Sequence, residues 1–253
     1  MKLKFTEYGN TGQPIIILHG LFGSSKNWGS IGRELGMKYH VFCLDLRNHG
    51  DSPHALSHNL RDMADDVYEF IVDNSISNPI LIGHSMGGLV TILFSFLHPN
   101  KIYFPIIVDI APMNYPLDYE KEFSCLKMDV SGYSSRESID RDMMEILPDH
   151  FIRQFLQMNL ERTENGYRWK INVPVLEKSR DAFELKLGDG EFYSGKAIFI
   201  LGSESDYVKR ENYPIIKKYF PESEIEIIKG AGHYLHHTHQ KEFIKILKNS
   251  IQG

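Results

Sequence analysis

Cysteine is scarce in this chain of 253 residues, which has only Cys43 and Cys125. Two cysteines do not make a disulfide framework, and no Cys/His pairing has the spacing of a zinc site. We therefore expect both thiols to be reduced and buried. The segment 233–239 holds four histidines, but no carboxylate or cysteine accompanies them at ligand spacing. We accordingly predict no metal site.

Concentrated positive charge and long apolar runs are also missing. The chain has 28 Lys and Arg against 33 Asp and Glu, a formal net charge of −5, and no basic block. Nucleic-acid binding needs a concentrated positive footprint, so we expect no nucleic-acid partner. No apolar run approaches the roughly 18 residues that span a bilayer, and residues 1–7 do not look like a signal peptide. We expect a cytoplasmic protein that does not bind membranes.

The rest of the composition is that of an ordinary globular protein. Hydrophobic residues make up 42% of the chain and charged residues 24%, with 20 Gly and 11 Pro. These values exclude disordered, collagen-like and low-complexity proteins. The length fits one large α/β domain, or a core domain with an insertion, better than two independent domains.

Short apolar runs alternate with helical patterns in the first half of the chain. The strand-like runs are 14–18, 41–46, 79–83 and 101–110, and helical spacing is found at 61–72 and 87–97. Alternation of this kind is typical of βαβ units. The runs are rich in Ile, Val, Leu and Phe, as in strands that are buried on both faces. We predict an α/β fold with a mostly parallel central sheet flanked by helices.

This alternation stops between residues 112 and 195, where helix signals dominate and no strand is predicted. Ser134–Glu137 forms a capping box before a helix that ends near Leu147, and Pro148-Asp149 precedes a helix that continues to about Leu160. The strand pattern resumes at 197–201 and 224–229, and 243–251 indicates a closing helix. We therefore predict a core of residues 1–111 and 196–253, interrupted by a helical cap at 112–195.

A possible nucleophile lies in Gly83-His84-Ser85-Met86-Gly87-Gly88, which contains G-x-S-x-G directly after an apolar strand and before a helix. This context predicts a nucleophile elbow, in which glycines allow strained backbone angles and close strand–helix approach. The simpler interpretation is a helix-capping serine in a glycine turn. A serine nucleophile needs a base. His233 follows Gly230-Ala231-Gly232, a loop of small residues that lets its imidazole reach Ser85.

Backbone donors must also stabilise the negative charge that develops on a substrate carbonyl. The N–H of Met86, at the start of the helix after Ser85, is one expected donor. Leu21, in the loop after the strand at 14–18, is expected to supply the other, and Phe22 is the neighbouring possibility. We also expect Phe22 and Trp28, near this loop, to border an acyl pocket.

Five segments together resemble the α/β-hydrolase superfamily, and within it the YbfF-type esterases and the abhydrolase-domain-11 group. They are Leu18–Ser24 (LHGLFGS), Asp45–Pro53 (DLRNHGDSP), Gly83–Gly88 (GHSMGG), Val108–Pro112 (VDIAP) and Gly230–His233 (GAGH). The resemblance runs nearly from end to end. It implies a Ser-His-acid hydrolase with a helical cap, active on short acyl esters or thioesters, and without a cofactor.

The resemblance also bears on the acid that would orient His233. Many α/β hydrolases place it after the strand predicted at 197–201, where this chain has Ser205 and then Asp206. In the YbfF-like group the carboxylate comes from the end of the preceding strand, which Asp109 matches here. Asp109 is the favoured acid and Asp206 the alternative.

The sequence thus predicts a serine esterase that acts on a small-molecule acyl ester, as a monomer or a small homo-oligomer. Two alternatives use the same fold. One is a carbon–carbon bond hydrolase or lyase with the same three residues, and the other is a small-molecule receptor with slow turnover. A haloalkane dehalogenase is disfavoured because its nucleophile would be an Asp at the position of Ser85.

Overall fold

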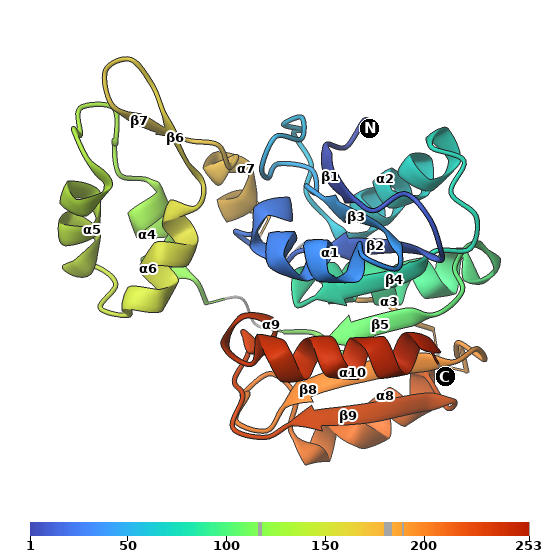
Figure 1. Ribbon diagram of the computed structural model, residues 1–253. Helices are drawn as coiled ribbons and strands as arrows, with labels where there is room; N and C mark the ends of the chain where they lie inside the picture. The colour runs from blue at the N-terminus through green and yellow to red at the C-terminus, as the bar shows by residue number, and fades with distance from the viewer. Residues whose placement is uncertain (116–117, 180–183, 189, 253) are drawn as a thin grey trace.

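In the computed structural model, which describes residues 1–115, 118–179, 184–188 and 190–252, a seven-stranded sheet forms the centre of the molecule (Figure 1). All neighbouring strands are parallel except the pair β1 and β3. The predicted mostly parallel sheet is therefore confirmed. In their spatial order the strands are β1 (Phe5–Tyr8), β3 (His40–Leu44), β2 (Pro14–Leu18), β4 (Ile80–His84), β5 (Pro105–Val108), β8 (Ala197–Gly202) and β9 (Ser223–Ile228).

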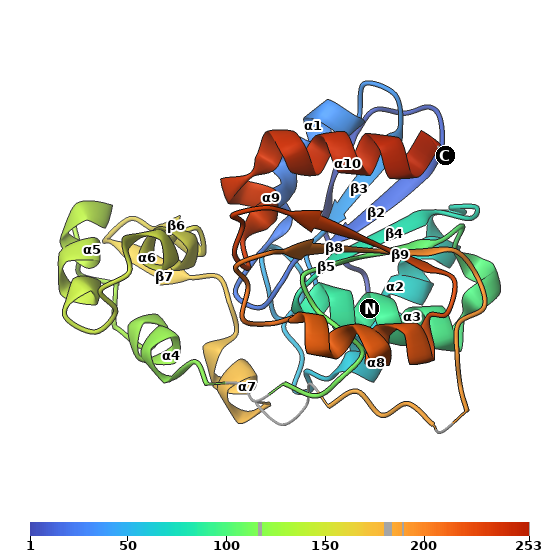
Figure 2. The same cartoon turned by 90° about the horizontal axis from the view of Figure 1, so that it is seen from below.

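Helices cover both faces of this sheet (Figure 2). On one face lie α1 (Gly29–Leu35) and α10 (Gln240–Gln252), and on the other lie α2 (Leu60–Asp73), α3 (Met86–Leu97) and α8 (Tyr213–Tyr219). Every residue of β4 is buried. Burial from two sides explains why the strand residues form continuous apolar runs instead of alternating with polar ones. Short 3-10 helices occur at Ser25–Trp28, Pro99–Lys101 and Arg210–Asn212.

Two parts of the sheet differ from the sequence prediction. The run predicted as one strand at 101–110 begins with the last residue of the 3-10 helix Pro99–Lys101 and contains only the short strand β5. Strand β1 was not predicted, because three of its four residues are exposed and it therefore lacks an apolar run. It pairs antiparallel at the sheet edge, where solvent reaches one side of the strand.

Beside the core, residues 118–178 form a lobe of helices and a small sheet (Figure 1). Its elements are α4 (Glu120–Leu126), α5 (Arg136–Met144), α6 (His150–Gln157), β6 (Leu160–Arg162), β7 (Tyr167–Trp169) and α7 (Val173–Lys178), and α9 (Leu235–Thr238) belongs to the adjoining core loop. The side chains of Ser135 and Asp149 accept hydrogen bonds at the starts of α5 and α6, as expected for N-caps.

The prediction that this region contains no strand is wrong. Strands β6 and β7 pair antiparallel, and α6 ends at Gln157 and does not continue to Leu160. Strands of three residues are too short to show a clear alternation of apolar and polar side chains. Farther along, Leu185 and Tyr193 pack in the main core, and the Tyr193 N–H donates to the Tyr219 carbonyl. The last part of the range 112–195 therefore packs on the core.

One buried arginine holds α5 and α6 of the lobe together. The Arg153 side chain on α6, which is 4% exposed, donates to both oxygens of Asp140 on α5 at 3.0 and 3.2 Å. It also donates to the carbonyls of Leu147 and Pro148, in the loop between these helices, at 3.0 and 2.7 Å. Arg153 therefore satisfies a carboxylate and two backbone acceptors at once.

We predict that Arg153→Met lowers the free energy of unfolding by about 3–5 kcal/mol, because the change leaves these acceptors without their charged donor. Urea titration monitored by circular dichroism measures the loss. Arg168→Met is the control, since Arg168 lies in the same lobe but is 70% exposed in its ion pair with Glu161. It should change stability by no more than about 1 kcal/mol. Equal effects of the two substitutions would contradict the role given to Arg153.

Candidate active site

Ser85 lies on the tight turn between β4 and α3. Its backbone has φ +53° and ψ −118°, a region that side chains disfavour. A Cβ at Gly83 would lie 2.1 Å from the Gly87 carbonyl oxygen, and one at Gly87 would lie 2.6 Å from the His19 carbonyl oxygen. Only glycine fits at either position. The two glycines thus allow the close approach that holds Ser85 at the carboxyl end of the sheet, directly before α3.

Asp109 and His233 are joined by a hydrogen bond, and His233 lines the same cavity as Ser85. Asp109 follows β5, is completely buried and also has a positive φ of +53°. His233 Nδ1 and Asp109 Oδ2 are 2.7 Å apart. The carboxylate also accepts a hydrogen bond from the Gly202 N–H at 2.9 Å and another from the Ser205 hydroxyl. Three donors thus compensate for the burial of this carboxylate.

The orientation of His233 leaves its other ring nitrogen for Ser85. Because Nδ1 faces Asp109, Nε2 is the remaining nitrogen that can accept a proton. Ser85 and His233 line one cavity of about 20 Å³ between the core and the lobe, together with Leu21 and Glu122. The loop of His233 is fixed by His84, whose Nε2–H donates to the His233 carbonyl at 2.9 Å.

Asp206, the alternative acid, points away from this cavity. Its side chain is 93% exposed and forms an ion pair with Lys209 at 3.2 Å. The structure therefore brings Asp109, and not Asp206, to His233. Ser205, which the sequence analysis did not single out, binds Asp109 instead. Its place three residues after Gly202, where many α/β hydrolases carry the acid, was the available signal.

Two neighbouring amides in the loop after β2, those of Leu21 and Phe22, differ in their hydrogen bonding. The Phe22 N–H donates to His49 Nε2 at 3.3 Å, and His49 Nδ1–H donates to the Arg47 carbonyl at 3.0 Å. Burial holds the pKa of His49 well below its usual value, which keeps this ring neutral and able to accept. Among the described residues, no hydrogen bond is found for the N–H of Leu21 or of Met86. These two amides, rather than Phe22, are the candidate oxyanion donors.

The two residues expected at an acyl pocket differ in position. Phe22 lines the cavity of Ser85, and its ring packs edge-on against Tyr119 and Phe123 of the lobe at 5.5 and 5.2 Å. Trp28 is 1% exposed, stacks on His236 at 4.6 Å and lines neither cavity at Ser85. The short helix Ser25–Trp28 turns this indole into the core, so Trp28 has a packing role.

Tyrosines connect the lobe to His233. The Tyr207 ring stacks on the His233 ring with centroids 3.6 Å apart and planes at 12°. The hydroxyl groups of Tyr207 and Tyr119 are 2.6 Å apart, and the Tyr115 hydroxyl donates to the Tyr207 carbonyl at 3.1 Å. No motif marks these tyrosines, so sequence reasoning missed them. They fix the plane of the imidazole from the side of the lobe.

Ser85 also lines a second small cavity, which is mostly apolar. It also measures about 20 Å³, and its lining is almost entirely apolar or aromatic. Leu21, Ser85 and Tyr119 line both cavities. Its remaining lining residues are Met86, Leu89, Ile110, Tyr115 and Tyr207. Ser85 therefore lies between two chambers of different polarity.

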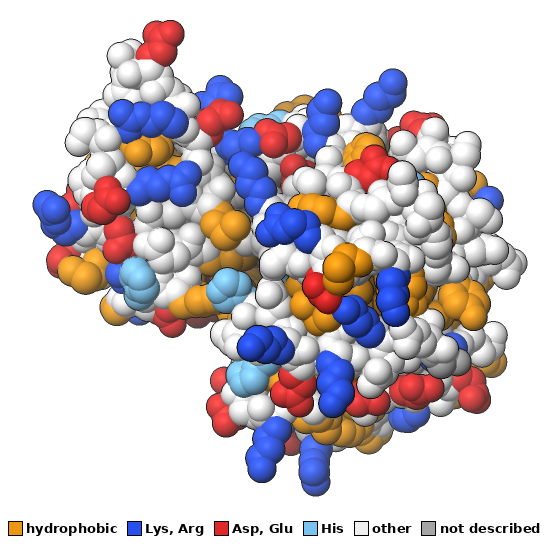
Figure 3. Space-filling view, viewed as in Figure 1, with side chains coloured by type: hydrophobic (Ala, Val, Ile, Leu, Met, Phe, Trp, Pro, Cys, Tyr) orange, Lys and Arg blue, Asp and Glu red, His pale blue; other side chains and the backbone are white. Residues whose placement is uncertain are grey.

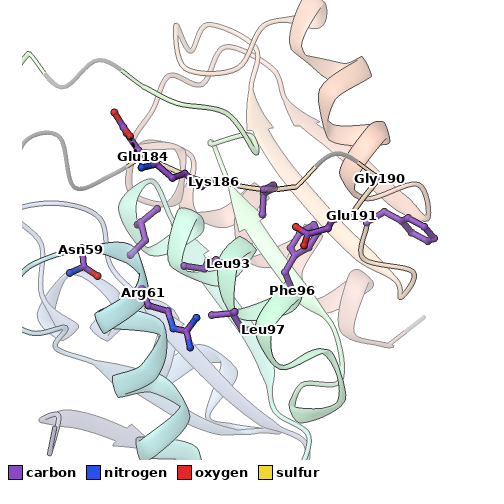
Figure 4. Close-up of a pocket in the computed structure, with 12 residues that line it drawn as sticks. Asn59, Arg61, Leu93, Phe96, Leu97, Glu184, Lys186, Gly190 and Glu191 are labelled. Carbon is purple, nitrogen blue, oxygen red and sulfur yellow. Dashed lines mark ion pairs between the residues drawn. The ribbon is translucent and has the colours of Figure 1, made fainter.

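A much larger groove, of about 740 Å³, lies elsewhere on the molecule (Figure 4). It is bordered by α2, α3 and residues of 184–187 and 190–192, and charges of both signs surround it, among them Arg61 and Glu184. It shares no lining residue with either cavity at Ser85. Its size therefore does not make it part of the candidate active site.

The histidines of 233–239 do not converge on one point. His236 stacks on Trp28, while His239 Nδ1 lies 2.9 Å from the Thr238 hydroxyl. Within the described ranges, no three His, Cys, Asp or Glu side chains are placed to hold a metal ion. None of the helices in the described part of the chain combines the length and the apolar character needed to cross a bilayer.

Comparisons with known proteins agree with this fold. Residues 13–240 match the alpha/beta hydrolase fold family. The sn-1-specific diacylglycerol lipase ABHD11 of Xenopus laevis is 34% identical over 96% of this chain and 80% of that protein. Esterase YbfF of Escherichia coli is 31% identical over 88% of this chain and 87% of that protein. The solved structure of a marine microorganism esterase has a TM-score of 0.92 and 37% identity, covering 98% of both chains.

The buried histidines around the site generate a prediction about stability and pH. Burial lowers the pKa of His236 to about 3, below the value of 6.5 expected when the ring is exposed. Protonation therefore favours the unfolded state. The contribution of neutral His236 to the free energy of unfolding is complete above about pH 6.5 and is lost as the pH falls toward 3. His236→Asn should reduce the slope of unfolding free energy against pH in this window by about 1.4 kcal/mol per pH unit.

Urea titrations at several pH values between 4 and 7 measure this slope. His237→Asn is the matched control, because the neighbouring His237 side chain is exposed. It should leave the slope as it is in the parent protein. An unchanged slope in His236→Asn would show that His236 is not held neutral in the folded state.

Proposed function

This chain belongs to the alpha/beta hydrolase family, and from that premise we propose that it is a carboxylic ester hydrolase with Ser85 as its nucleophile. His233 serves as general base and then general acid, and Asp109 orients His233. The observation that carries this proposal is the 2.7 Å hydrogen bond between His233 and the buried Asp109, beside a serine on a strained turn. The similarity to an esterase and a lipase supports the same class of reaction.

Acylation begins when Ser85 Oγ attacks the substrate carbonyl and His233 Nε2 takes the hydroxyl proton. Asp109 stays ionised, holds the proton on Nδ1 and stabilises the imidazolium that forms. The carbonyl oxygen becomes an oxyanion, which the N–H groups of Met86 and Leu21 bind. The leaving alcohol then takes the proton from His233.

Deacylation repeats these steps with water as the nucleophile. His233 removes a proton from the water, which attacks the acyl group on Ser85, and the proton returns to Ser85 Oγ when the acid leaves. Each oxyanion donor contributes about 2.7–4 kcal/mol to the lowering of the barrier. We assign the lobe at residues 118–178 as the cap, which covers the site through the contacts of Tyr119 with Phe22 and Tyr207.

The apolar cavity beside Ser85 is suited to a short acyl group. To hold one water molecule, a cavity needs about 10–15 Å³ of space for the centre of the molecule. This cavity has about 20 Å³. Leu89 and Ile110 close it with buried apolar side chains. We infer that it takes the acyl chain of the substrate and limits its length.

Substitution of the two candidate acids tests the proposed reaction. Asp109→Asn should lower kcat on p-nitrophenyl acetate by a factor of about 10⁴, because the amide favours the wrong tautomer of His233. Asp206→Asn should leave kcat within about twofold, since this side chain is exposed and paired with Lys209. Ser85→Ala should lower kcat by about 10⁴ or more and provides the blank.

Steady-state kinetics with circular dichroism spectra of each variant measure these effects. Full esterase activity in Ser85→Ala would refute the proposal, and a severe loss in Asp206→Asn alone would refute the role of Asp109. Hydrolysis of a diketone without ester hydrolysis would favour a carbon–carbon bond hydrolase.

A second prediction concerns acyl length. Leu89→Ala enlarges the apolar cavity, so the ratio of kcat/KM for p-nitrophenyl hexanoate over acetate should rise by about fourfold for each further CH₂ group accommodated. Leu93→Ala, one turn later on α3 and facing the groove of Figure 4, is the control and should keep the parent ratio. Equal ratios in the two variants would show that this cavity does not receive the acyl chain.

A further inference from the structure

A groove of about 690 Å³ opens between the core and the lobe and leads to the catalytic cavity. On the core side it is lined by residues of the Ser25–Trp28 turn and α1, and on the lobe side by α6 and the start of α5. Phe155 and Tyr234 line both the groove and the cavity of Ser85 and His233. The inner end of the groove therefore lies next to the reacting atoms.

Among the described residues, three cationic side chains and no carboxylate line this groove. They are Lys26 and Arg33 from the core and Arg136 from the lobe. The chain as a whole has a formal net charge of −5. Figure 3 shows Lys and Arg side chains on both sides of the junction between the lobe and the core. Glu122 lines the inner cavity but not the groove.

Among the described residues these cations form no salt bridge, although Asp51 interacts electrostatically with Lys26. In the described part of the chain, no salt bridge joins Lys26, Arg33 or Arg136 to a carboxylate, whereas the nearby Lys170 is paired with Asp51. One Nη of Arg136 donates to the Leu160 carbonyl at 3.0 Å, which orients the guanidinium and leaves its other N–H groups for a ligand. Exposed cations that face one groove from two sides favour an anion between them.

The part of the groove nearest Ser85 is apolar. Phe151 and Phe155 of α6 pack against Tyr234 with ring centroids 5.0 and 5.4 Å apart, and Met158 extends this surface. A ligand that extends from Ser85 into the groove thus contacts aromatic rings near Ser85 and cations farther away. The volume of the groove also greatly exceeds the 20 Å³ of the apolar cavity at Ser85.

We propose that this groove binds the leaving group of the substrate and that this leaving group carries a phosphate. The acyl group is short and enters the apolar cavity, while the alcohol or thiol portion lies along the rings and places its phosphate among Lys26, Arg33 and Arg136. The inference rests on the proposed function, because it takes Ser85 as the point at which the substrate is cleaved. Two sources share this chemistry, a phosphorylated glycerol ester and a phosphorylated pantetheine thioester.

Matched substrates that differ only in the phosphate test this. The first pair is 1-acetylglycerol 3-phosphate and 1-acetylglycerol, and the second is S-acetyl-4′-phosphopantetheine and S-acetylpantetheine. The parent protein should cleave the phosphorylated member of at least one pair with about tenfold higher kcat/KM. The pair that shows the preference identifies the source of the leaving group. The preference should weaken when the salt concentration is raised from about 0.05 to 0.5 M, since salt screens exposed charges.

The variant Arg33→Gln/Arg136→Gln should lose this preference and keep the parent kcat/KM on the phosphate-free substrates. The control Arg61→Gln/Lys186→Gln removes the same charge from the groove of Figure 4 and should keep the preference. No preference in the parent protein, or a preference that survives in Arg33→Gln/Arg136→Gln, would overturn the inference. If Ser85→Ala still cleaves the phosphate-free esters, it is the proposed function that fails.

Discussion

The buried carboxylate of Asp109 is the constraint on which the geometry of the site depends. It accepts hydrogen bonds from the Gly202 amide at the end of β8, from Ser205 in the following loop and from His233 in the loop after β9. A fully buried charge without such donors would be strongly destabilising. The requirement to satisfy this carboxylate therefore draws three separate segments together at one end of the sheet. It also sets the tautomer of His233, which lines the same cavity as Ser85.

The lobe is coupled to this centre by aromatic contacts and not by the carboxylate. Tyr207 stacks on His233, and its hydroxyl contacts that of Tyr119. Phe22 packs among the lobe aromatics, and its N–H donates to His49. The same lobe residues that cover Ser85 thus also hold the loops that position its partners. The position of the lobe is thus linked to the orientation of the His233 imidazole. Movement of either would disturb the packing of Tyr119 and Tyr207.

Much of this arrangement could be predicted from the sequence, and the exceptions have physical reasons. Ser85 and His233 lie in local motifs whose glycines are required by close backbone approach, so short-range patterns indicate them. Asp109 is favoured by the family resemblance and by its place at the carboxyl end of a strand, and its contact with His233 depends on the order of strands in the sheet. Trp28 was placed at a pocket from its proximity in sequence, but the turn directs it into the core. Ser205 occupies the position where many α/β hydrolases carry the acid, but its bond to Asp109 and the stacking of Tyr207 on His233 depend on contacts that no local pattern encodes.

The most direct test of the account is the rate at which a fluorophosphonate modifies the protein, with the modified residue located by peptide mass spectrometry. This reagent reports nucleophile activation without involving any leaving-group site. The account predicts one modification, at Ser85, and a rate that falls at least about a hundredfold in Asp109→Asn, because the base is then no longer held in the required tautomer. Modification at another residue, or an equal rate in Asp109→Asn and the parent protein, would contradict it.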